Sequence, residues 1–277
     1  MKLGFMIYSL SRSLADGTLT VPGALALMKE CGVEGVDITD GHVTGYTAAE
    51  VRKMAEDAGI AISAWIGGGN LATSDPEIRK ASLDTIRALI DKSAEAGTRN
   101  LLVTTGGCAA DQDKAEGRRN VAAGLAEVLP VAKAAGIVLS IEDFGSPVAP
   151  YQNSAECMET CELAGPDLMM TYDSGNMIMA DEDPVEFLLA VKSRLAHAHA
   201  KDWELLPPDA ERGLTSRAGK KYIGTVVGTG VLDYPAIIKT LKGLNYTGYL
   251  SFEYEGTGDP VQAARDGMAY LRDLVVD

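Results

Sequence analysis

Acidic side chains close three apolar runs in the second half of the chain, where a buried charge needs a partner. Glu142 ends the run IVLSIE, Asp173 ends LMMTYD and Glu253 ends YLSFE. A further run, LAHAHAK, carries His199 near its end. Because an isolated charge inside an apolar strand is costly, we expect these acids to be paired or ligated. Three carboxylates and one imidazole predict a site that binds one divalent metal ion through these four side chains.

The donor set also favours particular metals. Carboxylate oxygens are hard ligands, and three of them with one imidazole suit Mn²⁺, Mg²⁺ or Co²⁺ better than the softer donor sets typical of structural zinc. We predict Mn²⁺ as the metal, with Mg²⁺, Co²⁺ and Zn²⁺ as the alternatives.

The residues two positions before the predicted ligands share their side of the strand, because side chains alternate along a strand. All of them can hydrogen-bond: Ser140, Thr171, His197 and Ser251. We expect a layer beneath the ligands that orients the carboxylates and fixes the tautomer of His199. For Ser140 and Ser251, the alternative is that a barrel interior simply needs small residues. His197, one layer deeper, is a core or supporting histidine rather than a ligand. The residues one position before the ligands should face outward: Ile141, Tyr172, Ala198 and Phe252.

The elements that must position these residues are eight short apolar runs that alternate with longer amphipathic stretches. The runs predict strands at 3–8, 35–38, 60–66, 100–105, 137–142, 168–173, 195–201 and 249–253. Many of the stretches between them begin with Asp, Asn or Thr and end at Gly, as helices do. This alternation predicts an α/β fold, a closed (β/α)8 TIM barrel with its catalytic residues at the carboxyl ends of the strands. The length of 277 residues suits a single domain over 1–277.

One connection is longer than the others. It runs from Asp202 to Leu232, between the seventh predicted strand and its helix. Long loops on this side of a barrel commonly build binding sites, so we expect a lid or a substrate wall over 202–232. A solvated excursion is the alternative.

Several side chains near the predicted strand ends are candidates for contact with a substrate. Aromatic rings stack on the apolar faces of a sugar and exclude water, and basic groups can hold an oxygen or an anion. The candidates are Tyr8, His42, Trp65, Asn176, Lys201, Trp203 and Arg217. Packing is the alternative for both tryptophans. Pairing with a barrel acid is the alternative for Lys201, a solvated position for Arg217 and an ordinary loop position for His42.

The order and spacing of several motifs resemble a known family. VLSIEDFG, TYDSGN, HAHAKDW, VVGTGVLDY and GYLSFEYEG follow one another at the spacings of strands five to eight, and LGFMIYSL and VEGVDI are also similar. The chain thereby resembles the sugar phosphate isomerase/epimerase group of the xylose isomerase-like TIM barrels, which includes ketose 3-epimerases, inosose dehydratases and endonuclease IV. The resemblance covers nearly the whole chain. It is specific for the superfamily and only weakly specific for the reaction.

The resemblance implies roles for the same residues. The family's metal ligands fall on Glu142, Asp173, His199 and Glu253. In the family's epimerases the metal chelates neighbouring oxygens of a ketose, and the catalytic glutamates that match Glu142 and Glu253 exchange a proton on the adjacent carbon from opposite faces. The physics agrees, because a metal that polarises a carbonyl group acidifies the neighbouring C–H bond.

Two positions depart from the epimerase pattern. The family's epimerases carry a second glutamate six residues after the first, where this chain has Val148. They also carry a histidine three residues after the aspartate, where this chain has Asn176. These differences weaken an assignment to ketose 3-epimerase and leave the superfamily membership intact.

We predict a metal-dependent isomerase or epimerase that acts on a small keto-sugar or related polyol. The main alternative is a lyase or dehydratase of a keto-sugar or inosose, because loss of a β-hydroxyl group begins with removal of the same proton. A hydrolase of the endonuclease IV type relies on many histidines, and this chain has three. A non-catalytic sugar-binding protein is the remaining alternative.

Composition narrows the class of partner. The net charge of −14 opposes binding to a phosphate backbone, so a nucleic-acid partner is disfavoured. The chain shows no apolar stretch near the roughly 20 residues of a membrane span, and its first residues lack the cleavage pattern of a secretory signal. We expect a cytoplasmic protein that acts on a small molecule and has no membrane partner. A homo-oligomer is expected only as a general tendency of enzymes.

Overall fold

The barrel expected from the sequence is present in the computed structural model of the chain, which describes residues 1–276. Within those residues, eight parallel strands close on themselves in the order β1-β11-β7-β6-β5-β4-β3-β2. The strands are β1 Lys2–Met6, β2 Gly35–Thr39, β3 Ala61–Gly68, β4 Asn100–Thr104, β5 Val138–Glu142, β6 Met169–Asp173, β7 Leu195–Ala200 and β11 Tyr249–Phe252. The predicted (β/α)8 TIM barrel is therefore confirmed. Asp277, the last residue of the predicted domain, lies outside the described residues.

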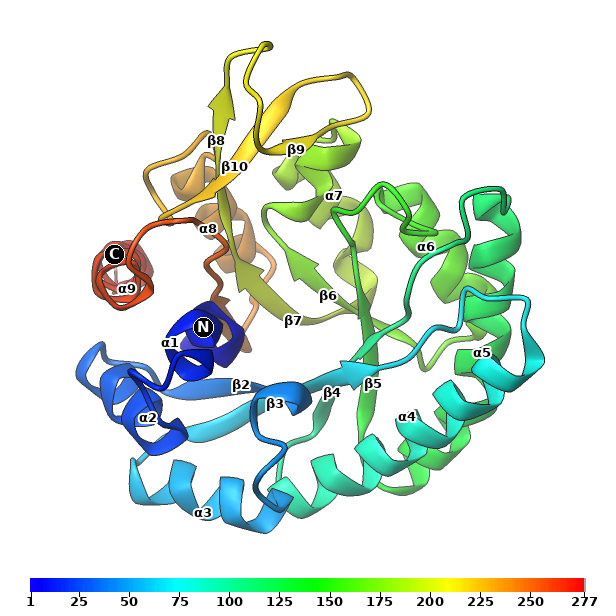
Figure 1. Cartoon of the computed structure of the whole chain (residues 1–277), viewed down its shortest axis with the longest axis horizontal. Coiled ribbons are helices and arrows are strands. Elements are labelled where there is room, and N and C mark those ends of the chain that lie inside the picture. The colour runs from blue at the N-terminus through cyan, green and yellow to red at the C-terminus, as the bar shows by residue number, and fades with distance from the viewer. Residues whose placement is uncertain (277) are drawn as a thin grey trace.

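Helices surround the strands on the outside of the barrel (Figure 1). The longer ones are α2 Val21–Glu30, α3 Ala48–Asp57, α4 Pro76–Ala96, α5 Lys114–Ala134, α6 Ser154–Ala164, α7 Pro184–Val191, α8 Tyr234–Gly243 and α9 Pro260–Val276. The polar residues expected to start helices act as caps, because Thr20, Asp75 and Asp183 accept backbone N–H groups of the first turn. Among residues 1–276, no helix combines the length and the apolar character needed to cross a membrane.

Short helices follow some strands at the mouth of the barrel. They are η1 Ile7–Leu10 and α1 Ser11–Ala15 after β1, η2 Asp40–His42 after β2, and η3 Asn176–Ala180 after β6, whereas η4 Lys192–Arg194 precedes β7. The segments that follow β1, β2 and β6 lie on the side where the strands end, so they form part of the rim around the predicted site, whereas η4 lies at the opposite end of the barrel.

The strands are buried on both faces, as parallel strands in a barrel must be. The residues expected to face outward, Ile141, Tyr172, Ala198 and Phe252, are fully buried in the core between strands and helices. Tyr172 contacts Phe187 of α7, with the two ring centroids 6.1 Å apart. Because side chains alternate, the residues that follow them in the sequence point into the barrel. This parity places the predicted metal ligands inside the mouth.

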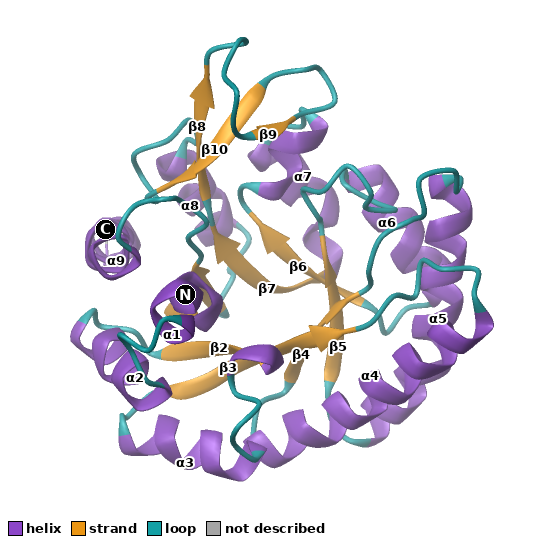
Figure 2. Ribbon diagram, in the orientation of Figure 1, coloured by secondary structure: helices purple, strands orange, loops and turns teal. Residues whose placement is uncertain are grey.

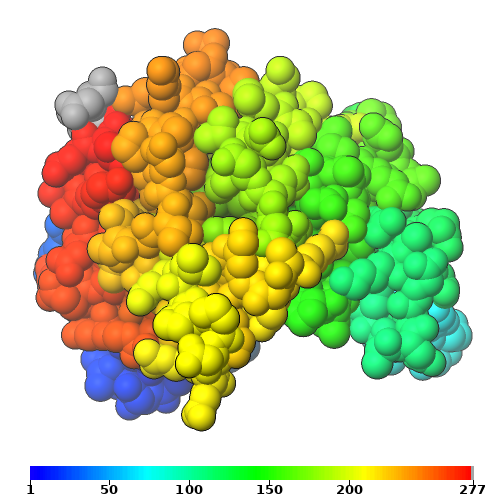
Figure 3. All heavy atoms as spheres, turned by 90° about the horizontal axis from the view of Figure 1, so that it is seen from above, coloured from blue at the N-terminus to red at the C-terminus, as the bar shows by residue number. Residues whose placement is uncertain are grey.

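The long connection from Asp202 to Leu232 folds into a small antiparallel sheet (Figure 2). Its strands are β8 Asp202–Leu206, β9 Leu214–Thr215 and β10 Lys221–Thr225, with β10 in the centre. The sheet projects beyond the barrel in Figure 1, and its residues form the yellow surface in Figure 3. The connection is thus an ordered wall at the mouth of the barrel and not an irregular loop.

One contact closes the connection at its base, and another holds the sheet against the barrel. The carboxylate of Asp202 accepts the backbone N–H groups of Gly228 and Gly230 at 3.0 and 2.9 Å, which closes the base of the connection. Gly224 lies so close to the segment after β11 that a Cβ atom there would be 2.7 Å from the carbonyl carbon of Glu255. Only glycine allows this approach. The sheet is therefore held directly against the residues that follow Glu253.

Candidate metal centre

The predicted ligands converge at the mouth of the barrel. Glu142 and Asp173 are the last residues of β5 and β6, His199 lies in β7, and Glu253 directly follows β11. One donor atom from each lies within 4.8 Å of the others. His199 Nδ1 is 2.5 Å from Glu142 Oε1 and 3.3 Å from Glu253 Oε2. The parallel register produces this arrangement, since Asp173 and Ser251 are both paired with His199.

The donor atoms fit a divalent cation. Asp173 Oδ1 accepts the backbone N–H groups of Gly175 and Asn176 at 2.6 and 3.0 Å, which fixes the carboxylate. Among the described residues, Asp173 Oδ2 and Glu253 Oε2 are buried without a hydrogen-bond partner. A buried carboxylate oxygen without a partner is costly, and a cation bound between these atoms and His199 would remove that cost. The residues present therefore suit a hard divalent metal.

The pKa values of Asp173 and His199 indicate that negative charge is in excess at the centre. Burial raises the pKa of Asp173 to about 6, although Lys201 opposes the shift and Glu253 adds to it. Burial opposes protonation of His199, but Glu142 and hydrogen bonds with carboxylates including Asp37 raise its pKa well above the usual value. Without a cation, the cluster therefore takes up protons that a metal would displace.

Lys201 is the cation that the chain itself supplies to the centre. The side chain is almost fully buried, and Nζ lies 2.7 Å from Glu253 Oε1 and 3.4 Å from Asp173 Oδ2. Nζ also lies 3.3 Å from Glu255 Oε1 and donates to Asn176 Oδ1 at 3.2 Å. Burial disfavours the charged amine, but these acids raise the pKa of Lys201 well above its usual value. One lysine cannot neutralise the surrounding carboxylates, so enough negative charge remains to balance a divalent cation.

The layer expected beneath the ligands is present. Ser140 Oγ and Thr171 Oγ1 are 2.8 Å apart, and Ser251 Oγ is 3.3 Å from His197 Nε2. All of these side chains are buried. Each of these four side chains makes at least one hydrogen bond, although His197 Nδ1 has no partner among the described residues. A role in orienting the ligands remains a prediction.

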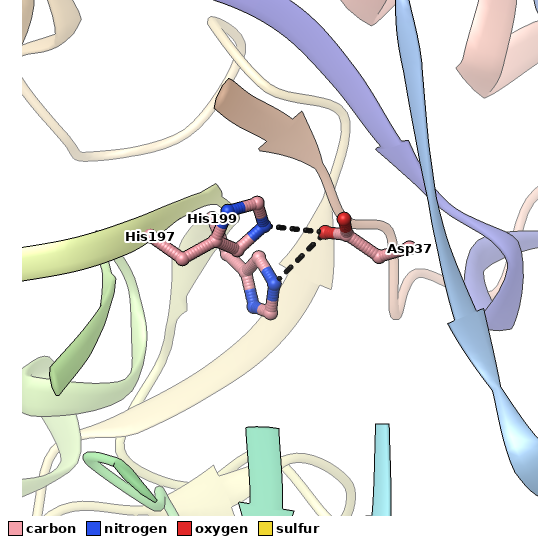
Figure 4. Close-up of side chains that lie close together, drawn as sticks. All are labelled: Asp37, His197 and His199. Carbon is pink, nitrogen blue, oxygen red and sulfur yellow. Dashed lines mark hydrogen bonds and ion pairs between the residues drawn. The ribbon is translucent and has the colours of Figure 1, made fainter. Parts of the chain in front are cut away.

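Asp37 of β2 also belongs to this layer, although the sequence analysis did not predict it as a site residue. Its Oδ2 lies 2.8 Å from His197 Nε2 and 3.2 Å from His199 Nε2 (Figure 4). Its Oδ1 accepts a hydrogen bond from Ser63 at 2.6 Å. Burial raises the pKa of Asp37, but the two histidines lower it by more, so the net shift of the pKa is downward. A carboxylate on Nε2 of His199 leaves Nδ1 as the nitrogen that faces the other ligands.

Two further acids near the centre were also missed. Asp143 follows Glu142 and is fully buried, and it accepts the backbone N–H group of Asp173 at 3.3 Å. Burial, with the charges of Asp173 and Glu142, raises the pKa of Asp143 well above its usual value. Glu255 is the second acid, and it pairs with Lys201. Asp143 directly follows Glu142 in EDFG, and Glu255 stands two residues after Glu253 in EYEG, and this closeness in sequence was the available signal.

The structure brings most of the predicted substrate contacts to the mouth. Tyr8 and Trp203 line a cleft of about 520 Å³ beside the metal ligands, although Trp203 is only 2% exposed, so the geometry favours packing for this tryptophan as well. Asn176 accepts a hydrogen bond from Lys201. The ring of His42 meets that of Tyr8 edge-on, with centroids 5.9 Å apart. Contact of these residues with a substrate remains a prediction.

Trp65 and Arg217 are placed elsewhere. Trp65 is 1% exposed in the core between strands and helices, and its indole N–H donates to Asp40 at 3.0 Å. The guanidinium group of Arg217 is held by Gln152 and Glu156 at 2.8 to 3.0 Å. The geometry therefore favours the alternative of packing for Trp65. It gives Arg217 a structural pairing instead of a free position at the mouth.

Comparison with known proteins identifies the family. The model of the xylose isomerase-like TIM barrel matches residues 25–274. The chain belongs to this family. Inosose dehydratase of Mesomycoplasma hyopneumoniae is 33% identical over 132 residues, which are 45% of this chain and 44% of that protein. Inosose dehydratase of Clostridium perfringens is 28% identical over 162 residues, 56% of this chain and 54% of that protein. These matches thus span only about half the length of these curated relatives.

Solved structures share the fold across nearly the whole chain. A sugar phosphate isomerase/epimerase from Parabacteroides distasonis is 19% identical with a TM-score of 0.72, covering 98% of this chain and 93% of its own. D-psicose 3-epimerase in the presence of D-fructose is 18% identical with a TM-score of 0.77 and full coverage of both chains, each 100%. The IOLI protein with a zinc atom is 15% identical, with a TM-score of 0.77 and coverage of 99% and 98%. At these identities the likeness is one of fold.

Proposed function

We propose that this protein is a divalent-metal-dependent isomerase or epimerase that removes a proton next to the carbonyl group of a small keto-sugar or related polyol. The observation that carries the proposal is the centre itself, in which three carboxylates and His199 Nδ1 converge within 4.8 Å and two buried carboxylate oxygens lack a hydrogen-bond partner among the described residues. The hard donor set favours Mn²⁺ as the metal. The zinc atom of one structural relative supports a divalent ion at such a fold.

The chain's own carboxylates perform the proton transfer. A divalent cation at the centre would polarise a substrate carbonyl group and acidify the neighbouring C–H bond. Glu142 and Glu253 approach from β5 and β11, with β6 and β7 between them in the barrel. They flank His199, so they can act on opposite faces of a carbon placed between them. One glutamate takes the proton and the other returns one.

The charges around the centre favour an uncharged substrate. Lys201 is engaged by buried acids, and Arg217 by Gln152 and Glu156. Arg12, the basic residue of the neighbouring cleft, donates to backbone carbonyl groups of residues 256–258. An anionic group would meet cations that are already paired, on a chain of net charge −14. We infer a sugar without a phosphate group.

Dehydration is the second candidate, and the curated relatives favour it. Inosose dehydratases match about half of this chain at 28 to 33% identity. Abstraction of the same proton followed by loss of a β-hydroxyl group uses the same metal and the same glutamates. The product, and not the first step, separates the two reactions.

Solvent-deuterium uptake tests the proposal. The protein with Mn²⁺ is incubated in D₂O with a panel of ketoses, keto-sugars and inososes, and each sugar is followed by NMR. We expect deuterium on the carbon next to the carbonyl group, together with either a C-epimer, an isomer or an unsaturated product. These products distinguish epimerase, isomerase and dehydratase.

Two variants serve as controls. Glu253→Gln should stop the exchange, and metal analysis of this variant shows whether the loss reflects the base or the bound ion. Glu186→Gln, at an exposed position on α7, should leave the exchange intact. Absence of exchange across the panel, in protein that carries one metal per chain, would count against the proposed chemistry and favour a protein that only binds sugar.

A further inference from the structure

A cleft lies beside the metal centre, outside the space between the predicted ligands. Its volume is about 520 Å³, and three segments form its walls: residues 8–12 after β1, the β8–β10 sheet, and residues 254–257 after β11. None of the predicted metal ligands lines it. A sugar held at the metal by its keto group would therefore fill the cleft only if the substrate continues beyond the reacting ring.

The cleft is joined to the metal centre through two residues. Glu255 lines the cleft and pairs with Lys201 at 3.3 Å, and the same Nζ lies 2.7 Å from Glu253. Tyr8 lines the cleft as well, and its hydroxyl group lies in the field of both glutamates and of Lys201. A molecule that occupies the cleft would thus have its near end at the reacting carbon.

The walls suit an uncharged ring with apolar faces. Tyr8 and Leu214 expose an aromatic ring and an aliphatic side chain to the cleft, at 37% and 42%, whereas the rings of Trp203, Tyr222 and Tyr254 are nearly buried and form its floor. Aromatic rings pack on the C–H faces of sugars while hydroxyl groups reach polar atoms at the edges. The guanidinium group of the cleft is already bonded to backbone carbonyls. The remaining charged group is the carboxylate of Glu255, which repels anions.

We propose that this cleft is a second sugar subsite, so that the substrate is a keto-sugar joined by a glycosidic bond to another neutral sugar ring. The proposal rests on the proposed function for the identity of the reacting ring. The subsite itself depends only on the cleft, and it can bind a sugar without any reaction at the metal.

Saturation-transfer NMR and titration with defined sugars test the subsite. The probes are D-fructose, three glucosyl-fructoses that keep the keto group (turanose, leucrose and isomaltulose), and methyl α-D-glucoside, which has no keto group. We expect at least one glucosyl-fructose to bind about tenfold or more tightly than D-fructose. Methyl α-D-glucoside should bind with or without Mn²⁺.

Two matched substitutions on the small sheet locate the binding. Leu214 on β9 lines the cleft, whereas Leu205 on β8 is equally apolar, similarly exposed and outside it. Leu214→Trp fills the cleft, so the advantage of the disaccharide over D-fructose and the binding of methyl α-D-glucoside should both disappear. Leu205→Trp should change neither.

The outcomes separate this proposal from the proposed function. Binding of methyl α-D-glucoside that Leu214→Trp abolishes supports the subsite even if no sugar exchanges a proton, in which case the proposed function fails alone. Proton exchange on D-fructose with no glucosyl-fructose preferred over it overturns the subsite and leaves the function standing. Equal effects of Leu214→Trp and Leu205→Trp also overturn the subsite.

Discussion

At the scale of single residues, the centre consists of buried charges that stabilise one another. Buried carboxylates surround His199. Lys201 pairs with Glu253, and Asp37 forms a hydrogen bond with His199. Each of these groups would be costly alone. Their arrangement leaves His199 Nδ1 and two carboxylate oxygens facing one another, which is why we assign the metal there.

Substitution of Asp37 should weaken metal binding without touching a ligand. Asp37→Asn keeps the shape of the side chain but removes the negative charge on Nε2 of His199, so the imidazole becomes a poorer donor. We expect metal affinity to fall about 10- to 100-fold. Calorimetric titration of Mn²⁺ into the metal-free protein measures this, with Asp40→Asn on η2 as the control outside the centre. An unchanged affinity would show that Asp37 only packs the two histidines.

Metal affinity should also depend on pH, because protons compete for the ligands. The pKa of Asp173 is raised to about 6, and that of His199 is raised well above its usual value. The metal-free protein therefore holds a proton on each of these side chains below its raised pKa. Binding must release these protons, so metal affinity rises with pH. Below the pKa of each ligand, every decrease of one pH unit should lower the affinity about tenfold for each proton displaced. Titrations at pH 5.5 and 7.5, in buffers of different ionisation enthalpy, count the released protons. Binding without proton release at pH 5.5 contradicts the assignment of these ligands.

The limits of the sequence are visible at the same residues. Glu142, Asp173 and Glu253 were found because an acid that ends an apolar run is unusual. Asp37 carries the same signal inside GVDIT. Its meaning comes from His197, 160 positions away in the chain and across the barrel. Pairings between distant strands leave no local pattern, so the contact of Asp37 with the two histidines could not be predicted, whereas the residues two positions before the proposed ligands could.

At the scale of elements, the strands and helices followed from their periodicity, but the direction of some side chains did not. In a parallel barrel both faces of a strand are buried, so SAWI cannot reveal whether Trp65 or Ile66 faces the interior. The structure puts Trp65 on the helical side and Ile66 in a separate cluster with Met6 and Leu102. The small sheet was missed because DWELL and KYIGT mix polar and apolar residues in strands that are partly exposed.

Asp202 should control the order of the small sheet. Asp202→Ala removes the acceptor of the N–H groups of Gly228, Gly230 and Leu232, and the loss of a hydrogen bond to a charged acceptor costs about 1.5–3 kcal/mol. We expect faster proteolytic cleavage within 203–232 while metal affinity changes little, because Asp202 is not a ligand. Limited proteolysis followed by mass spectrometry locates the cuts. Asp209→Ala, at an exposed position in the same connection, is the control, and equal cleavage of both variants contradicts this role.

At the scale of the whole molecule, the barrel is a rigid frame that carries an unfavourable concentration of negative charge at one end. The ligands come from strands β5, β6 and β7 and from the end of β11, so a cation bound among them ties together segments from residue 142 to residue 253. An ion that binds the folded chain and not the unfolded one stabilises the fold by mass action. Metal binding is therefore expected to be visible as stability of the entire barrel.

Thermal unfolding tests this coupling. Free Mn²⁺ at about 100 times its dissociation constant should raise the free energy of unfolding by about 2.7 kcal/mol, which corresponds to several degrees in Tm for a chain of this size. A chelator should reverse the shift. Asp173→Asn removes a ligand charge but keeps an oxygen that can accept the N–H groups of Gly175 and Asn176, so this variant should fold and lose most of the shift. If the variant gains as much stability as the natural chain, the ion binds elsewhere on the acidic surface and the assigned centre is wrong.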